Sequence, residues 1–401
     1  MSTTFVQDLL REHLKTFTPY ASARRSMSGG NLWLNANESP YGRSYQVATE
    51  ELNRYPDFQN KPLNQAYAEY AGVTASQVIS HRGSDESIEL MIRSFCEPGR
   101  DKILICPPTY GMYAISASIN HNETVAVPLR ANDWQLDLAA IEQALNAANG
   151  AIKVVFLCNP SNPLGNPLQE ADMLAVIEMC RGRALVVVDE AYFEFYQETA
   201  QRSGSVSTVS DTVVSDPIVS DTKLTDPNLQ TSVSMLRYLP EFDNLVVMRT
   251  LSKAFGLAGI RVGFTIGSVA LVQALLPVLA PYPLPDMSVQ IAQQALRLDD
   301  RLKTRQDTIE IVAERNLLAP ELVKFPWVEQ VHASVTNFIL IQVRNADALM
   351  QHCIAQGVLI RNQSSQLGLS QAIRITVGSP EENIELLRVL ASFQPATEEF
   401  A

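Results

Sequence analysis

The sequence lacks three features that would each point to a different class of protein. It has no apolar run of transmembrane length, no excess of positive charge, and no basic N-terminus followed by an apolar core. Its 31 Lys and Arg against 43 Asp and Glu give a net charge of −12, which argues against a general nucleic-acid or membrane-surface binder. We therefore expect no signal peptide, no membrane partner and a cytoplasmic location.

Cysteine and histidine are also scarce. The five cysteines are odd in number and form no CxxC pair, and Cys96, Cys106 and Cys158 lie in apolar runs. Buried, reduced thiols are the expected state. The five histidines show no ligand spacing, so we expect no metal site. No G-x-G-x-x-G follows a strand, which disfavours a nicotinamide dehydrogenase.

What the chain does contain is an alternation of short apolar runs and helical segments. Such alternation is typical of an α/β protein whose mostly parallel sheet is covered by helices on both faces. In such sheets, ligands bind beyond the C-terminal ends of the strands. The runs that we interpret as strands are KILICPP, ETVAVPL, KVVFLCN, ALVVVDE, NLVVMRT and RVGFTIG.

The pattern changes near Pro285, where a long helical stretch at residues 288–316 leads to short strands and a last helix. We predict an N-terminal arm at 1–35, a large domain at 36–285 and a smaller α+β domain at 286–401. Residues 201–233 include a degenerate VSD repeat with almost no large apolar side chain, and they predict a solvated insertion. A partner-binding role for this repeat stays open.

Polar residues that follow the apolar runs are the candidates for chemistry. Asp189 ends ALVVVDE, where a buried carboxylate needs a cap, a magnesium ion or a protonated heterocycle as its partner. Ser84 and Asp85 precede a helix, and there they either cap it or help bind an anion. Asn162 lies in NPSNPLG, which is either an ordinary turn or a stiffened loop that fixes one amide.

The segment RTLSKAFGLAGIR sets Lys253 among apolar residues just after a strand. Desolvation lowers the pKa of such an amine and makes it nucleophilic toward carbonyls. Ser252 and Arg261 nearby are suited to a phosphate. An aldehyde cofactor with a phosphate and a basic ring nitrogen, such as pyridoxal phosphate, would satisfy all of these groups.

Together these motifs resemble those of the fold-type I, pyridoxal-phosphate-dependent aminotransferases of class I and II. The matches run in the family's order from about residue 19 to 380. They imply a large domain with a mostly parallel seven-stranded sheet between helices, a smaller C-terminal α+β domain, an N-terminal arm and a homodimer with shared active sites. The matching segments are LNANESPYG, RYPD, GSDESIEL, CPPTYGMY, NPSNPLG, VVVDEAYFEF, RTLSKAFGLAGIRVGF, APYPLP and RITVG.

The resemblance implies three catalytic residues. Lys253 would form the Schiff base with the cofactor and move the substrate's Cα proton, and Asp189 would pair with the ring nitrogen. Tyr192 would bond the cofactor's phenolic oxygen together with Asn162. Tyr110 would stack on the ring.

It also implies the residues that hold the cofactor phosphate. Ser84 and Asp85, through backbone N–H groups, would do so together with Ser252 and Arg261. Tyr55, in RYPD, would reach the phosphate from the partner subunit.

The substrate follows from a narrower resemblance, to family members that transaminate L-histidinol phosphate with 2-oxoglutarate, giving imidazole acetol phosphate and glutamate in histidine biosynthesis. Tyr20, Arg361 and Arg374 would bind these anionic substrates. The alternatives within the fold are an aromatic amino acid aminotransferase and a threonine-phosphate decarboxylase. A DNA-binding regulator with an aminotransferase-like domain is disfavoured by the acidic charge.

Overall fold

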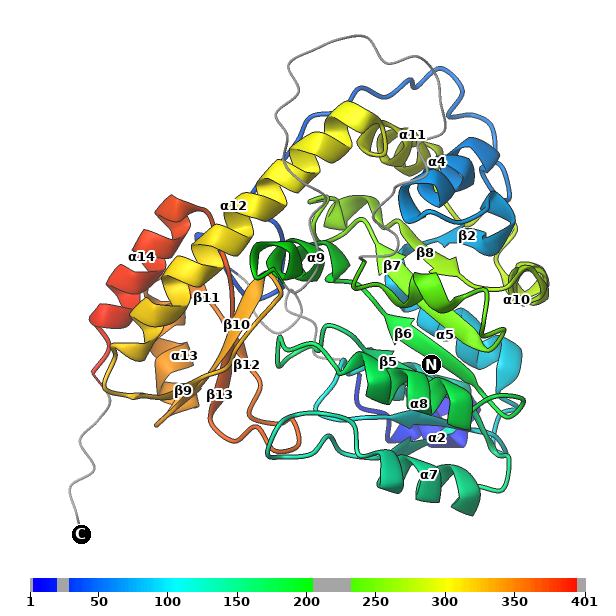
Figure 1. Cartoon of the computed structure of the whole chain (residues 1–401), viewed down its shortest axis with the longest axis horizontal. Helices are drawn as coiled ribbons and strands as arrows, with labels where there is room; N and C mark the ends of the chain where they lie inside the picture. Colours follow the sequence, from blue (N-terminus) through cyan, green and yellow to red (C-terminus); the bar gives the residue numbers. More distant parts are fainter. Residues whose placement is uncertain (1–2, 20–28, 205–231, 395–401) are drawn as a thin grey trace.

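The computed structural model describes residues 3–19, 29–204 and 232–394. Its larger domain is built on one seven-stranded sheet, with a smaller domain beside it and the long helix α12 running along both (Figure 1). The strand order across the large sheet is β2-β8-β7-β6-β5-β3-β4. The strands are β2 (Val78–His81), β3 (Lys102–Ile105), β4 (Glu123–Ala126), β5 (Ile152–Cys158), β6 (Leu185–Asp189), β7 (Leu245–Thr250) and β8 (Gly263–Ile266).

The direction of these strands sets where a ligand can bind. β8 is antiparallel to both of its neighbours, β2 and β7, whereas the neighbours among β7, β6, β5, β3 and β4 pair in parallel. The C-terminal ends of all strands except β8 therefore meet at one edge of the sheet, and β8 begins at that edge. The expected mostly parallel, seven-stranded α/β sheet is confirmed.

Helices cover the sheet on both faces, because alternate residues of each strand point to opposite sides. In β5, Val155 and Leu157 belong to one hydrophobic cluster, and Val154 and Phe156 belong to another. The first cluster includes residues of α4 (Lys61–Ala71), α7 (Leu138–Ala147), α8 (Glu170–Met179) and α11 (Asp286–Ala295). The second includes residues of α5 (Gly83–Phe95), α6 (Met112–Asn120) and α10 (Val269–Leu275).

The small domain has its own antiparallel sheet, in the order β12-β13-β10-β9. A separate short strand of the N-terminal segment, β1 (Leu32–Trp33), pairs in parallel with β11 (Val358–Leu359) and so ties that segment to this domain. The remaining elements are β9 (Val328–Val331), β10 (Phe338–Val343), β12 (Arg361–Asn362), β13 (Ala372–Thr376), α12 (Leu298–Val323), α13 (Ala346–Ala355) and α14 (Pro380–Ala391).

The helical stretch expected at residues 288–316 is present, but it is divided into two helices. The chain forms α11 and α12 there, with a break at Leu296 and Arg297, where Arg297 takes an extended conformation (ψ 151°). Asp299 and Asp300 stand in the first turn of α12, where acidic side chains favour a helix start. Helical periodicity continues across the break, so hydrophobic spacing alone did not reveal it.

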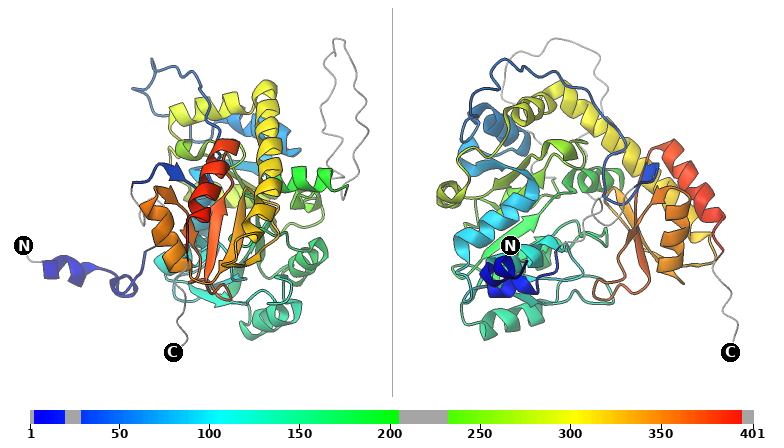
Figure 2. Two further views of the ribbon diagram at one scale, coloured as in Figure 1. Left: turned by 90° about the vertical axis from the view of Figure 1, so that its left-hand side faces the viewer. Right: turned by 180° about the vertical axis from the view of Figure 1, so that it is seen from behind.

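Two further segments complete the chain. Near the N-terminus, α1 (Thr3–Leu9) projects from the body of the molecule (Figure 2), and α2 (Glu12–Lys15) contacts the end of α6, where the ring of His13 stacks on that of His121 at 4.3 Å. The predicted insertion at 201–233 begins within the end of α9 (Phe193–Arg202), and its residues 205–231 lie outside the described residues. Short 3-10 turns occur at Ala75–Gln77, Met235–Tyr238, Ala258–Ile260 and Leu276–Val278.

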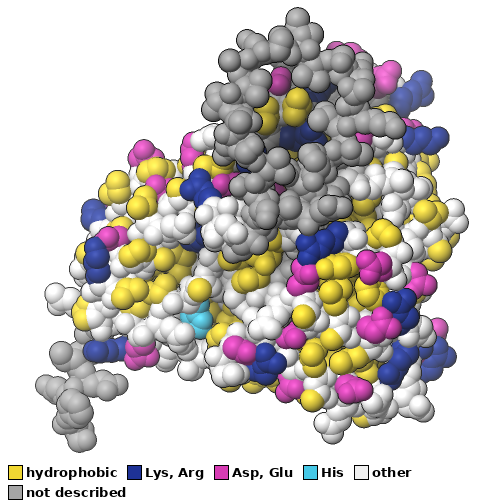
Figure 3. Space-filling view, in the orientation of Figure 1, with side chains coloured by type: hydrophobic (Ala, Val, Ile, Leu, Met, Phe, Trp, Pro, Cys, Tyr) yellow, Lys and Arg dark blue, Asp and Glu magenta, His cyan; other side chains and the backbone are white. Residues whose placement is uncertain are grey.

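The surface agrees with the acidic composition. On the face that Figure 3 shows, basic and acidic side chains of the described residues are interspersed rather than gathered into an extended basic patch. Over the same described ranges, none of the helices combines the length and the apolar character needed to span a bilayer. All five cysteines are buried and unpaired, as expected from their apolar surroundings.

Candidate active site

A pocket of about 310 Å³ lies at the C-terminal edge of the large sheet, where the small domain and the N-terminal segment close over it. Loops that follow β2, β3, β5, β6 and β7 all contribute side chains, as the shared direction of these strands requires. Eleven predicted site residues line this one pocket: Ser84, Asp85, Tyr110, Asn162, Asp189, Tyr192, Ser252, Lys253, Arg261, Arg361 and Arg374.

Lys253 lies in the turn after β7 and is partly buried. Its Nζ donates a hydrogen bond to the carbonyl oxygen of Ala36 at 2.9 Å and lies 5.8 Å from the ring centroid of Tyr192. Burial, with a smaller contribution from the nearby Arg374 guanidinium, lowers the pKa of Lys253 from 10.5 to about 8. The amine is thus available in its neutral, nucleophilic form near physiological pH.

Asp189 is the last residue of β6 and is 3% exposed. Its Oδ1 accepts the N–H of Ala191 at 3.1 Å, and its Oδ2 accepts the hydroxyl of Tyr113 at 2.7 Å. Burial raises the pKa of Asp189 to about 6, and the two donors oppose that rise. A protonated ring nitrogen in the pocket would provide the opposite charge that this buried carboxylate otherwise lacks.

Tyr192 and Asn162 stand on the side of the pocket nearest the small domain. The hydroxyl oxygen of Tyr192 accepts a hydrogen bond from the amide of Asn37 at 2.8 Å, so its own proton is left to donate elsewhere. The guanidinium of Arg374, from β13, donates to Asn162 Oδ1 at 2.6 Å and to the carbonyl of Asn35 at 3.0 Å. Arg374 therefore joins the small domain, the large domain and the N-terminal segment at the pocket.

The opposite end of the pocket is built for an anion. Helix α5 begins at Gly83, so the first backbone N–H groups of this helix, including those of Ser84 and Asp85, have no partner within the helix. Ser84 Oγ is buried and has no hydrogen-bond partner among the described residues. Arg261 reaches the same place and contacts the Asp85 carboxylate at 3.3 Å, and Thr250 Oγ1 donates to Ser252 Oγ at 2.9 Å.

Two glycines allow the start of β8, the first turn of α5 and the Arg261 side chain to lie close together. A Cβ at Gly263 would lie 2.8 Å from the carbonyl carbon of Gly83 and 2.9 Å from the nitrogen of Ser84. Gly83 itself has φ +77°, and a Cβ there would lie 2.9 Å from Arg261 Nη2. An orphaned hydroxyl, a helix N-terminus and a guanidinium thus fit the phosphate of pyridoxal phosphate, while Asp189 and Lys253 fit its ring nitrogen and aldehyde.

Two predicted residues are not in the pocket. Tyr20 lies outside the described residues. Tyr55 is 80% exposed and stacks on Tyr282, with ring centroids 4.3 Å apart. The resemblance implies that Tyr55 extends into the pocket of the partner subunit, and this contact stays a prediction.

Sequence reasoning missed several residues at the site. Asn35, Asn37 and Glu38 line the pocket, and Tyr113 contacts Asp189 from behind it. All four lie inside segments quoted for the family resemblance, LNANESPYG and CPPTYGMY. Their place in these segments was the only sign in the sequence that these four residues lie at the site. The spacing of the four residues does not indicate which side chains they contact.

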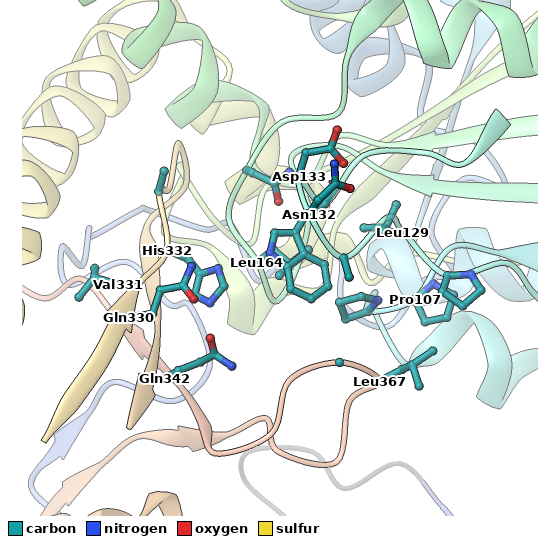
Figure 4. A pocket seen from close by; sticks show the side chains of 17 residues that line it. Pro107, Leu129, Asn132, Asp133, Leu164, Gln330, Val331, His332, Gln342 and Leu367 are labelled. Carbon is teal, nitrogen blue, oxygen red and sulfur yellow. Dashed lines mark hydrogen bonds between the residues drawn. The ribbon is translucent and has the colours of Figure 1, made fainter. Parts of the chain in front are cut away.

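A second and larger cavity, of about 660 Å³, lies where loops of the large domain meet β9 and β10 of the small domain (Figure 4). Leu129 and Leu164 face it from one side and His332 and Gln342 from the other. None of the predicted site residues lines it, and its lining contains no lysine. The pocket around Lys253, though smaller, is the one with the groups needed for carbonyl chemistry.

The chain belongs to the aminotransferase class I and II family, whose pattern matches residues 31–390. This family and the chain's full-length relatives make it a pyridoxal-phosphate-dependent aminotransferase, so the expected enzyme class and cofactor are confirmed. More narrowly, the chain is 50% identical over 394 residues to histidinol-phosphate aminotransferase 2 of Idiomarina loihiensis, covering 97% of this chain and 99% of that protein.

Two other comparisons agree. The histidinol-phosphate aminotransferase of Escherichia coli is 41% identical over 394 residues, covering 98% of this chain and all of that protein. The crystal structure of the Sinorhizobium meliloti histidinol-phosphate aminotransferase, in complex with pyridoxal-5′-phosphate, superposes with a TM-score of 0.75 over 96% of this chain and 98% of that one. At 21% identity, this last comparison supports the fold alone.

Proposed function

We propose that the protein transaminates L-histidinol phosphate with 2-oxoglutarate, giving imidazole acetol phosphate and glutamate. The observation that carries the proposal is one pocket that joins Lys253 and Asp189 to two arginines of the small domain, Arg361 and Arg374. The full-length relatives that are 41–50% identical are named for this activity, which favours it over the aromatic and decarboxylase alternatives.

When bound, pyridoxal phosphate supplies an aldehyde that takes up an amino group and an electron-poor ring that accepts the electrons left by the departing Cα proton. Lys253 would hold the aldehyde through its Nζ and would be free to act as a base once a substrate amine takes that place. With pyridoxal phosphate bound, the neutral amine of Lys253 would be the base that takes up the substrate's Cα proton and gives it back. Asp189 would hold the protonated ring nitrogen, and Tyr192, whose hydroxyl proton is not used by Asn37, would donate to the phenolic oxygen.

The arginines explain how one pocket can serve two substrates. A guanidinium binds a phosphate or a carboxylate through two parallel hydrogen bonds. Arg361 and Arg374 can therefore hold the phosphate of histidinol phosphate in one half-reaction and a carboxylate of 2-oxoglutarate in the other. Arg374 is 8% exposed and held by Asn162 and Asn35, so its guanidinium is already oriented before substrate arrives.

The substrate proposal predicts a strong preference among amino donors. With 2-oxoglutarate as acceptor, kcat/KM for histidinol phosphate should exceed that for phenylalanine or threonine phosphate by about a hundredfold, because a site built around polar contacts rejects ligands that leave them unpaired. Initial rates of glutamate formation measure this, with reactions lacking a donor as the control. An equal or higher kcat/KM for phenylalanine would show that the aromatic alternative is correct.

The lowered pKa of Lys253 predicts how fast cofactor-free protein takes up pyridoxal phosphate. Only the neutral amine attacks the aldehyde, so the rate should rise with pH and level off above the Lys253 pKa of about 8. At pH 7 the neutral fraction is about 300-fold larger than for an ordinary lysine. Stopped-flow absorbance measures the rate, and a profile that still rises steeply at pH 10 would contradict the assignment.

We further propose a homodimer in which Tyr55 contributes to the partner's pocket. Its support is the exposure of apolar surface near the N-terminus: Phe5 and Leu9 of α1 are 58% and 71% exposed, on an arm that projects from the body (Figure 2). Burial of such side chains against a second copy is favourable.

A cytoplasmic location is also proposed, since a reducing compartment suits five unpaired thiols.

A further inference from the structure

Behind the pocket, Tyr113 of α6 contacts the carboxylate that the proposed chemistry needs. The Tyr113 hydroxyl lies 2.7 Å from Asp189 Oδ2, and both side chains are buried, with Tyr113 fully so. Burial and the neighbouring Asp189 raise the pKa of Tyr113, so the phenol keeps its proton and acts as the donor. Tyr113 does not line the pocket and so does not contact a ligand there.

The position of this hydroxyl is fixed by packing. The ring of Tyr113 stacks on Phe156 of β5, with centroids 4.8 Å apart and planes 7° from parallel. It also makes a T-shaped contact with the ring of Tyr110, at a centroid distance of 5.6 Å and an angle of 86°. Phe156 and Asp189 lie on neighbouring strands of the sheet, β5 and β6, so the sheet itself sets the geometry of donor and acceptor.

The two oxygens of Asp189 are thus both held from the protein side. Oδ1 accepts the backbone N–H of Ala191 and Oδ2 accepts Tyr113, while the carboxylate still faces the pocket. Each ionised carboxylate oxygen can accept more than one hydrogen bond, so acceptor capacity remains for a ligand N–H. Donors to the ionised form favour that form over the protonated acid.

We propose that Tyr113 is a positioning residue that keeps Asp189 ionised and oriented toward the cofactor's ring nitrogen. The inference rests on the proposed role of Asp189 in binding pyridoxal phosphate. Tyr113 acts through Asp189 and touches no reacting atom. It is therefore distinct from Tyr110 and Tyr192, which line the pocket.

The variant Tyr113→Phe tests this with the loss of a single oxygen atom, leaving the stacking on Phe156 in place. Losing one charge-assisted hydrogen bond to a buried carboxylate should weaken equilibrium binding of pyridoxal phosphate roughly ten- to hundredfold. The absorbance change that reports proton loss from the lysine–cofactor linkage should also move to higher pH, because a less cationic ring repels that proton less.

Tyr70→Phe is the matched control. In the wild type, the Tyr70 hydroxyl donates a hydrogen bond to a carboxylate oxygen of Glu194 at 3.0 Å, away from the Lys253 pocket. This variant should bind pyridoxal phosphate like the wild type and show the same spectral transition. Thermal unfolding of both variants measures any general loss of stability.

The outcomes separate the inference from the proposed function. Weaker binding together with the upward spectral shift in Tyr113→Phe alone supports the positioning role. Unchanged binding, or weaker binding without the spectral shift, overturns it and leaves Tyr113 a packing residue, while the wild type still links the cofactor to Lys253. If the wild type itself forms no such link, the proposed function fails instead.

Discussion

Replacing Lys253 with alanine is expected to lower kcat by about 10⁴-fold while the protein stays folded. The variant loses the group that moves the Cα proton, a contribution of about 10²–10⁴ on its own, and also the amine that links the cofactor. Within the described part of the chain, the side chain makes one hydrogen bond, to the Ala36 carbonyl, so its removal costs the fold little. Steady-state transamination rates and circular dichroism measure the two expectations.

Lys303→Ala provides the control for that variant. Lys303 lies on α12, is 66% exposed and forms an ion pair with Asp300, three residues earlier. It does not line the Lys253 pocket. Its replacement should leave kcat unchanged, since exposed ion pairs contribute little. Full activity in Lys253→Ala would contradict the proposed mechanism.

Replacing Asp189 with asparagine is expected to lower kcat/KM by about a thousandfold. The amide has the same shape but cannot carry the negative charge that keeps the ring nitrogen protonated, and breaking a buried charge pair costs roughly 3–5 kcal/mol. The NH₂ group of the new amide would also face one of the two present donors, the Tyr113 hydroxyl or the Ala191 N–H, while the amide oxygen accepts from the other. Kinetics and the dissociation constant for pyridoxal phosphate report the loss.

Asp101→Asn is a matched control for this variant. Asp101 is 5% exposed, lies just before β3, and accepts the backbone N–H of Glu97 at 2.9 Å. Its replacement should change the free energy of unfolding without changing the affinity for pyridoxal phosphate. Equal losses of affinity in both variants would indicate a general structural effect and would refute the specific role of Asp189.

Much of the fold could be predicted because buried parallel strands form recognisable apolar runs. All six apolar runs that we interpreted as strands form strands, β3 to β8. The remaining strand of the large sheet, β2, was not among those runs. Its residues Ser80 and His81 are polar yet fully buried, and His81 is accommodated by contacts with Thr265 Oγ1 at 2.8 Å and the Gly83 carbonyl at 3.0 Å. Such tertiary partners of a polar strand residue cannot be read from one sequence.

The pocket could be predicted for a related reason. Asp189, Asn162 and Lys253 each follow an apolar run, and a parallel sheet brings the ends of such runs together. Tyr113 and Asn37 could not be identified in the same way. Tyr113 reaches Asp189 from a helix packed under the sheet, and Asn37 reaches Tyr192 from a segment 155 residues away. Their roles depend on packing between elements that no spacing rule connects.

The proposed mechanism requires that Lys253 carry the cofactor. Reduction of the purified protein with borohydride in the presence of pyridoxal phosphate, followed by digestion and peptide mass spectrometry, tests it most directly. We expect a stable pyridoxyl group on the peptide that contains Lys253, and none in Lys253→Ala. A modified peptide that contains a different lysine, with Lys253 unmodified, would contradict it.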